Sequence, residues 1–307
     1  MRFRNPVHGT EHPRPGKRLS TAAAILSACA LFTAGQAEAA PAPAPQEPAA
    51  SLVDPETPAG VQPLAAANGR AAQTLVFSDE FNGSTVDSSK WTARDQERSG
   101  AGAGDRWWYK PGNVRTDNNG ALALEVSNIG TNQYAGARID TQGRFTYTHG
   151  TLEASVHTPY VTNGHLAAVW LQADQGLNPG GAVDGTARDG AEIDLVETAY
   201  QADKYSTAIH WDGYEEHHQS LGTTPSAPGL HSVWYHTFGL DWTPTQLQFT
   251  YDGTVVRTVT DPKLISQVME FPILSHEILD AWADGSIHNE TFEWTSNMYV
   301  DYIRIWQ

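Results

Sequence analysis

Residues 189–200, Asp-Gly-Ala-Glu-Ile-Asp-Leu-Val-Glu-Thr-Ala-Tyr, place three carboxylates in a run whose Ile, Leu, Val and Thr residues favour a β-strand. Side chains alternate between the two faces of a strand, so Glu192 and Asp194 share one face. Glu197 lies an odd number of positions from Glu192 and would point to the other face of a regular strand. A β-bulge at Leu195-Val196 would absorb one residue and return Glu197 to the face of the other two carboxylates.

These carboxylates have two interpretations. The first is an ordinary solvated sheet face, although such faces usually mix both signs of charge and this run has no Lys or Arg. The second is glycoside hydrolysis with retention, which needs two carboxyl groups about 5–5.5 Å apart, one as nucleophile and one as acid and then base. A third carboxylate between them would adjust their pKa through like charge and hydrogen bonding.

Short strand-like runs separated by turn residues continue along the chain, and helix signals are almost confined to a turn near residues 262–267. Asp252-Gly253 predicts a hairpin turn between two of these runs. The runs are residues 121–126, 137–140, 150–157, 166–172, 192–197, 205–210, 235–242, 247–251, 254–258, 273–278 and 298–306. We therefore predict an all-β fold, an antiparallel β-sandwich with an open concave cleft across which a polymer can lie.

The composition restricts the partners. The 307 residues carry a formal net charge of −16, which disfavours nucleic acid, anionic lipid and polyanionic substrates. We expect a neutral polysaccharide as the partner, no nucleic-acid or membrane partner, and a monomer. The single cysteine excludes an intramolecular disulfide framework.

The N-terminus predicts export. Basic residues precede an apolar stretch at residues 19–33 and the small-x-small pattern Ala37-Glu38-Ala39, so residues 1–39 are predicted to be a secretory signal peptide and the protein to be extracellular. Lipid attachment at Cys29 is the alternative, because Leu26-Ser27-Ala28-Cys29 resembles a bacterial lipobox. Residues 40–73, rich in Ala and Pro, are predicted to be a mobile linker, and residues 74–307 the catalytic β-sandwich domain.

Four motifs in order make the chain resemble the glycoside hydrolases of family 16, the group of laminarinases, lichenases and agarases. The bulged Glu-x-Asp-x-x-Glu run at 192–197 is similar to the catalytic signature of this family. The opening, central and closing motifs are residues 79–83, 235–243 and 299–305. The resemblance covers about residues 75–307 and implies a jelly-roll sandwich of the concanavalin A type with a retaining, endo-acting mechanism.

The resemblance also implies roles for individual residues. Glu192 would be the nucleophile, Glu197 the general acid/base and Asp194 the residue that assists between them, with His210 near them on the neighbouring strand. This chemistry requires no cofactor. A structural calcium ion would lie on the convex side, bound by Glu80, Gly120 and Asp301, because calcium prefers oxygen ligands.

Aromatic side chains bind the flat apolar faces of sugar rings, so tryptophans of the cleft are candidate substrate ligands. Core packing is the alternative for each of them. The candidates are Trp170 and Trp282, which match cleft positions of the family, and also Trp107, Trp108 and Trp211. Arg138 resembles a family arginine that binds a sugar on the nonreducing side, and His276 and Glu277 depart from the usual strand ending and are expected to face the cleft.

The predicted function is that of an endo-β-glycosidase, with β-1,3-glucan as the favoured polymer. An endo-β-galactanase of the agarase type is the alternative within the same fold, and a transglycosylase would use the same residues. From another class, a noncatalytic carbohydrate-binding lectin would share the sandwich but would have no reason to keep all three carboxylates.

Overall fold

The computed structural model describes residues 52–64, 73–99, 102, 104–117 and 119–307. The predicted signal peptide, Cys29 and most of the predicted linker therefore lie outside the described residues. The described residues all belong to one compact unit.

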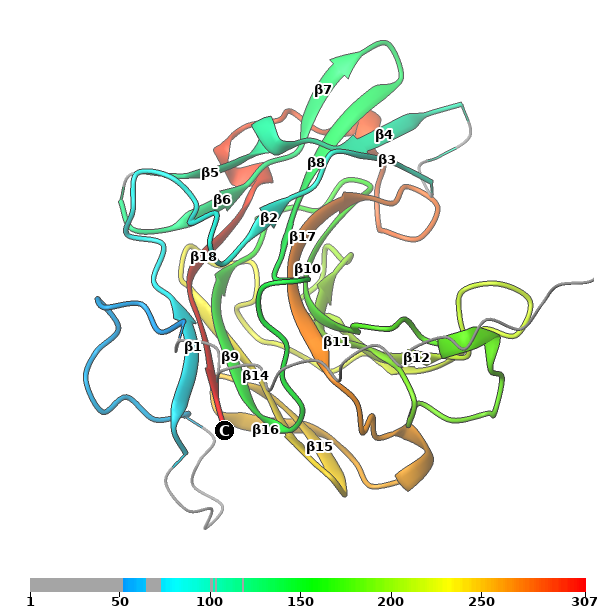
Figure 1. Cartoon of the computed structure of the whole chain (residues 1–307). Coiled ribbons are helices and arrows are strands. Elements are labelled where there is room, and N and C mark those ends of the chain that lie inside the picture. Colours follow the sequence, from blue (N-terminus) through cyan, green and yellow to red (C-terminus); the bar gives the residue numbers. More distant parts are fainter. Residues whose placement is uncertain (1–51, 65–72, 100–101, 103, 118) are drawn as a thin grey trace, which may run out of the picture. The chain divides into compact units, whose positions relative to one another are not determined.

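Two β-sheets form this unit, and Figure 1 shows both as curved layers. The described strands of sheet A follow the order β16-β15-β14-β9-β18-β6-β5, and β1 also pairs with β18. Its strands are β1 (Leu75–Asp79), β5 (Val114–Thr116), β6 (Leu122–Leu124), β9 (Gly150–His157), β14 (His236–Thr243), β15 (Gln246–Tyr251), β16 (Thr254–Val259) and β18 (Met298–Trp306).

Sheet B contains the strand with the three carboxylates of residues 192–197. Its described strands follow the order β13-β12-β11-β10-β17-β8-β4-β3, and β2 and β7 also pair with β8. Its strands are β2 (Thr92–Ala93), β3 (Gln96–Arg98), β4 (Arg106–Tyr109), β7 (Ser127–Gly130), β8 (Gln133–Asp140), β10 (His165–Ala173), β11 (Glu192–Thr198), β12 (Ser206–Trp211), β13 (Gln219–Thr223) and β17 (Glu270–Ile278). The β4–β8 pair is parallel.

The helical segments among the described residues are short turns of 3-10 helix. They are η2 (Pro111–Asn113), η3 (Pro179–Gly181), η4 (Pro262–Leu264), η5 (Ile287–Asn289) and η6 (Trp294–Ser296). Within the part of the chain that the structure describes, no helix is long and apolar enough to span a membrane.

The apolar core lies between the two sheets, as the alternation of side chains requires. On β10, Ala167, Val169 and Leu171 belong to the core cluster, whereas Trp170 points to the outer face of sheet B. On β9 of sheet A, Leu152, Ala154 and Val156 face the same core. The predicted all-β jelly-roll sandwich is confirmed, and each of the eleven predicted runs overlaps a strand of these sheets.

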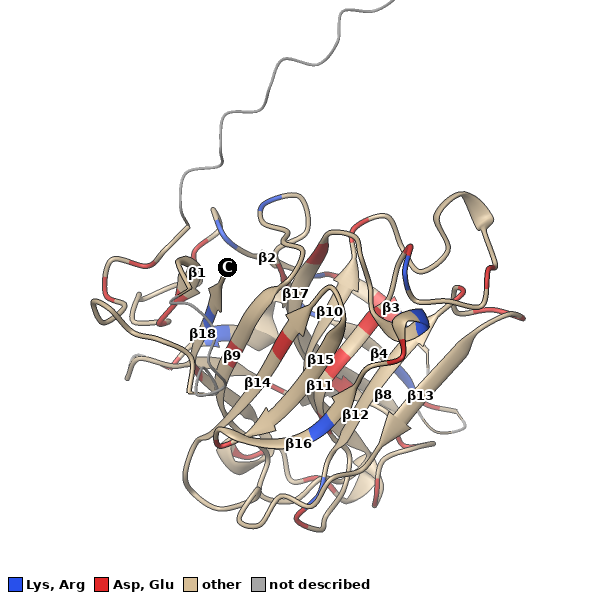
Figure 2. Cartoon of the chain, turned by 90° about the horizontal axis from the view of Figure 1, so that it is seen from below, with Lys and Arg blue, Asp and Glu red and all other residues tan. Residues whose placement is uncertain are grey.

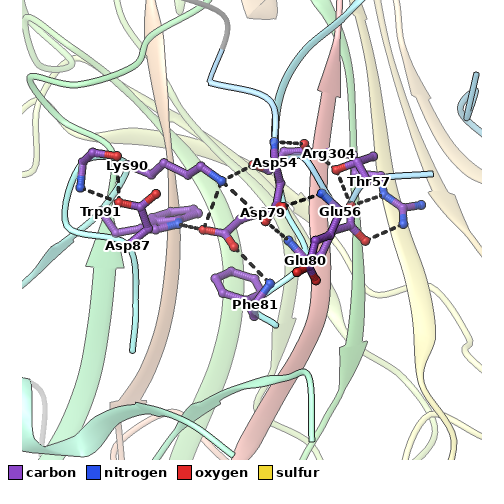
Figure 3. A network of polar contacts seen from close by, with 12 residues as sticks. Asp54, Glu56, Thr57, Asp79, Glu80, Phe81, Asp87, Lys90, Trp91 and Arg304 are labelled. Carbon is purple, nitrogen blue, oxygen red and sulfur yellow. Dashed lines mark hydrogen bonds and ion pairs between the residues drawn. The ribbon is translucent and has the colours of Figure 1, made fainter. Parts of the chain in front are cut away.

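The prediction that residues 40–73 form a mobile linker is wrong for residues 52–64. Leu52 forms a parallel bridge with Phe77 of β1, and the indole nitrogen of Trp306 donates to the carbonyl of Val61 at 3.1 Å. Figure 3 shows Asp54 beside Lys90, whose amino group lies 3.6 Å from the Asp54 carboxylate. These bonds outweigh the entropy of a segment that has little apolar periodicity of its own.

Candidate active site

The predicted β-bulge is present in β11. Val169 of β10 pairs with Val196, and the next residue, Trp170, pairs with Asp194, so the register skips Leu195. On the other side of β11, the register with β12 shifts between Asp194 and Glu197. The bulge therefore lies at Leu195-Val196, as expected, and it lets all three carboxylates contribute to the outer face of sheet B.

A groove runs over this outer face and contains the three carboxylates. We call it the Arg138 groove; it measures about 530 Å³ and takes its described lining mainly from β3, β8, β10, β11 and β17. A second groove of about 450 Å³, the Trp282 groove, lies over β11, β12 and β13. Glu197 lines both grooves. Figure 2 shows that acidic residues gather on β11 and the strands beside it.

Glu192 is held by two neighbours. The hydroxyl of Tyr214 donates a hydrogen bond to Oε2 of Glu192, and Nε2 of His210 lies 4.0 Å from its Oε1. Burial raises the pKa of Glu192, while His210 and the Tyr214 hydroxyl both act to lower it. The ionised form of Glu192 thus has partners that stabilise it.

Asp194 and His210 face each other between the strands. Nε2 of His210 lies 3.2 Å from Oδ2 of Asp194, and Nδ1 of His210 lies 2.8 Å from Nε2 of His218, whose ring is stacked on it. Burial lowers the pKa of His210, which favours a neutral imidazole. Burial, followed by the charge of Glu192, raises the pKa of Asp194 well above its usual range.

Glu197 has a different environment from Glu192. Burial raises its pKa well above the ordinary value, and the charges of Asp194, Glu192 and Glu277 raise it further. Every contribution favours the protonated form, whereas Glu192 has two groups that favour its carboxylate. Two titratable groups whose environments separate their pKa values in this way can serve as an acid and a nucleophile.

Arg138 and Trp170 form one wall of the Arg138 groove. The guanidinium of Arg138 lies 4.9 Å from the centre of the Trp170 ring, and its Nε donates to Oδ2 of Asp140 at 3.0 Å. The indole nitrogen of Trp170 donates to the Ser275 hydroxyl at 3.0 Å. Both predicted side chains therefore reach the cleft in fixed orientations.

Glu277 also lies in the Arg138 groove, where it accepts hydrogen bonds from the hydroxyls of Tyr109 and Ser275. Trp282 lies in the other groove and is 44% exposed, with Tyr200 packed edge-on against it at 6.0 Å. An exposed ring on a groove wall is available for stacking on a sugar.

The expectation that His276 faces the cleft is wrong. His276 is fully buried on the core side of β17, with Nδ1 3.0 Å from the carbonyl of Leu124 and Nε2 2.8 Å from Nδ1 of His165. Its neighbour Glu277 occupies the cleft face, and alternation sends adjacent residues to opposite faces.

The expectation that three further tryptophans bind sugar in the cleft is also wrong. Trp211 belongs to the core cluster, because it follows His210, which takes the cleft face. Trp107 is fully buried and donates to the carbonyl of Ser99 at 3.0 Å. Trp108 points to the face of β4 opposite Tyr109, under the guanidinium of Arg106, and lies outside the described lining of both grooves.

Sequence reasoning missed Tyr214. Asp212 and Gly213 both have a left-handed backbone, with φ of 60° and 81°, and this turn after β12 brings Tyr214 back over β11. Nε2 of Gln172 on β10 donates to the Tyr214 hydroxyl at 2.9 Å. The Asp-Gly pair signals the turn, but only the folded chain shows that Tyr214 reaches Glu192.

The side chain of Glu80 does not fit the predicted calcium site. Its two oxygens accept hydrogen bonds from Nε and Nη2 of Arg304 at 2.8 and 2.7 Å, so a guanidinium already occupies the position of a cation (Figure 3). Asp301 is exposed and accepts a bond from Ser155, and the backbone of Gly120 is left-handed with φ of 93°.

Residues 102–304 match the family model described as "Glycosyl hydrolases family 16". A β-glucanase of Rhodothermus marinus is 25% identical over 261 residues, which cover 76% of this chain and 85% of that protein. Glucan endo-1,3-beta-glucosidase A1 of Niallia circulans is 23% identical over 268 residues, 77% of this chain and 38% of that protein.

The fold has solved relatives as well. The laminarinase catalytic domain from Thermotoga maritima superposes with a TM-score of 0.62 at 23% identity, covering 76% of this chain and 98% of that chain. This likeness establishes the common sandwich fold.

Proposed function

The chain belongs to glycosyl hydrolase family 16, and from this premise we propose that it is a retaining endo-β-glycosidase that cleaves a neutral polysaccharide, with β-1,3-glucan as its preferred polymer. The membership makes it a glycoside hydrolase and not a noncatalytic lectin. The main support for the mechanism is a contrast between the two glutamates. The carboxylate of Glu192 has partners that stabilise its ionised form, whereas every neighbour of Glu197 favours its protonated form.

In the first step, the carboxyl proton of Glu197 passes to the glycosidic oxygen while a carboxylate oxygen of Glu192 attacks the anomeric carbon. The bond to the leaving sugar breaks, and the sugar on the nonreducing side stays attached to Glu192. In the second step, Glu197, now ionised, takes a proton from water, and the water oxygen displaces Glu192 from the anomeric carbon. Burial keeps the pKa of Glu197 high, and the charge of Asp194, when it is ionised, raises that pKa further.

Two features support action within a long polymer. Glu197 lines both the Arg138 groove and the Trp282 groove, so sugar units can lie on each side of the bond that is cut. Trp170 and Trp282 offer aromatic rings in the two grooves, and Arg138 and Glu277 offer hydrogen bonds in the Arg138 groove. We place the nonreducing side of the polymer in the Arg138 groove.

The choice of a β-glucan follows the names of both relatives, and the 1,3 linkage follows the name of the relative from Niallia circulans. The net charge of −16 agrees with a neutral polymer. We further propose that the protein is secreted, since residues 1–39 have the pattern of a signal peptide, and that it acts as a monomer.

A reducing-sugar assay on laminarin, lichenan, agarose and arabinogalactan tests the proposal. Release from laminarin, with retention of the anomeric configuration in fresh products, is expected. Release from a galactan but from neither glucan would replace β-1,3-glucan by the galactan alternative. Wild-type activity in Glu192→Ala would overturn the mechanism.

A further inference from the structure

A third groove lies on the outer face of sheet A, on the opposite side of the sandwich from the active site. It measures about 430 Å³, and its described lining includes Arg115, His157, Val233, Tyr235, Trp294 and Tyr299. The pairing register aligns three of these residues across the sheet: Arg115 on β5 and Tyr299 on β18 both pair with Ala123 of β6, and Tyr299 also pairs with His157 of β9. We call it the Trp294 groove.

Large aromatic rings border this groove and remain exposed. Trp294 of η6 is 62% exposed, and Tyr235, just before β14, is 41% exposed. The Tyr299 hydroxyl donates to the carbonyl of Trp294 at 3.2 Å, which ties η6 to the groove wall. Exposed rings gathered in one hollow, rather than scattered singly, indicate a binding surface.

A buried polar group lies on the groove floor. The imidazole of His157 is only 7% exposed and lies between the rings of Tyr235 and Tyr299, with both ring centres 5.9 Å away. Its Nδ1 has no hydrogen-bond partner among the described residues. A buried nitrogen without a partner is costly, so a ligand hydroxyl or a water that reached it would be stabilised there.

The charges of the groove favour a neutral ligand. The guanidinium of Arg115 is engaged by the carboxylate of Glu125, so it does not offer an unpaired positive charge to an anion. Burial and the nearby charge of Asp117 raise the pKa of Tyr235 to about 12, so its hydroxyl keeps its proton under ordinary conditions. Asp117 also lines the groove, and its carboxylate accepts hydrogen bonds from the backbone N–H groups of Asn119 and Ala121. The groove thus combines flat apolar surface with hydrogen-bonding groups whose charges are already engaged, which suits a sugar ring.

We propose that the Trp294 groove is a second carbohydrate-binding site, which holds a segment of neutral polysaccharide away from the active site. The choice of polymer rests on the proposed function. Because the two sites lie on opposite faces, the enzyme can hold one chain of an insoluble polymer while it cuts another. The site therefore matters for insoluble substrate and not for short soluble oligosaccharides.

Binding of the protein to insoluble β-1,3-glucan, measured by depletion from solution, tests this proposal. The measurement is made in a Glu197→Gln background so that the polymer is not digested. Trp294→Ala and Tyr235→Ala are expected to weaken binding about tenfold each, because each removes a stacking ring. Trp234→Ala is the matched control, since Trp234 is 73% exposed but lies outside the described lining of the groove; its binding should change less than twofold.

The same three substitutions in the active enzyme give the second readout. Trp294→Ala and Tyr235→Ala should slow hydrolysis of insoluble glucan and leave hydrolysis of a soluble β-1,3-oligosaccharide unchanged. Three results would each overturn the proposal. Both groove variants could bind as well as the wild type, or Trp234→Ala could lose as much binding as they do. The third result is a dimer in solution that Trp294→Ala dissociates. Failure of the wild type to cut any soluble glucan would instead refute the proposed function, and it would be seen without the groove variants.

Discussion

The hydroxyl of Tyr214 donates a hydrogen bond to Oε2 of Glu192, although the two residues lie 22 positions apart and only Glu192 belongs to β11. The bond favours the ionised form of the proposed nucleophile, and Gln172 holds the hydroxyl from the other side. Tyr214 is therefore a positioning residue that also adjusts the charge of Glu192.

Tyr214→Phe should lower kcat about tenfold and move the acidic limb of the kcat/KM profile to higher pH. The hydroxyl lowers the pKa of Glu192, so its removal raises that pKa, and a higher pH is needed to ionise the nucleophile. The measurement is kcat/KM on soluble glucan across the acidic range. Tyr160→Phe, which removes a hydroxyl from a ring that is 59% exposed, serves as the control. A profile that matches the wild type would exclude this role.

The two glutamates should differ in their response to azide. In Glu192→Ala, azide can take the place of the missing nucleophile and attack an activated aryl glycoside in one step, which gives an α-glycosyl azide. In Glu197→Ala, the covalent intermediate still forms on Glu192 and azide then displaces it, which gives the β-glycosyl azide. NMR of the products checks the assignment, and reversed configurations would exchange the two roles.

Asp194→Asn should move the basic limb of the kcat/KM profile to lower pH. Burial raises the pKa of Glu197, and the ionised form of Asp194 raises it further, so a neutral amide at this position lowers that pKa and the acid loses its proton at lower pH. The expected loss of kcat is about tenfold to a hundredfold. Asp184→Asn, on the loop before β11, is a control for the change from carboxylate to amide. A basic limb at the wild-type position would show that Asp194 does not govern Glu197.

The catalytic strand could be predicted from the sequence because it depends on local rules. Alternation places Glu192 and Asp194 on one face, and the odd spacing to Glu197 predicts the bulge that the register contains. The same alternation would have separated His276 from Glu277, and Trp211 from His210. His276 and Trp211 were wrongly assigned to the cleft because the assignment used residue type and motif and not the strand face on which each residue lies.

Other features depend on contacts between distant segments. Tyr214 acquires its position from a turn and from packing over β11, and no pattern in its own neighbourhood predicts this. The short strands β3 and β13 are polar and mostly exposed, so they lack the apolar alternation that identifies a strand. Residues 52–64 join the domain through contacts with residues more than 20 positions away, which an Ala- and Pro-rich composition does not reveal.

The pair of Glu80 and Arg304 should contribute strongly to stability. The carboxylate and the guanidinium form two parallel hydrogen bonds, and both residues are less than 10% exposed. Glu80→Ala would leave a buried guanidinium without its partner, so we expect the free energy of unfolding to fall by about 3 kcal/mol. Glu97→Ala is the matched control: it removes another Arg–Glu pair, with Arg106, whose side chains are 58% and 52% exposed, and it should cost less than about 1 kcal/mol. Urea unfolding of the two variants measures both values, and equal losses would show that burial does not set the strength of the Glu80–Arg304 pair.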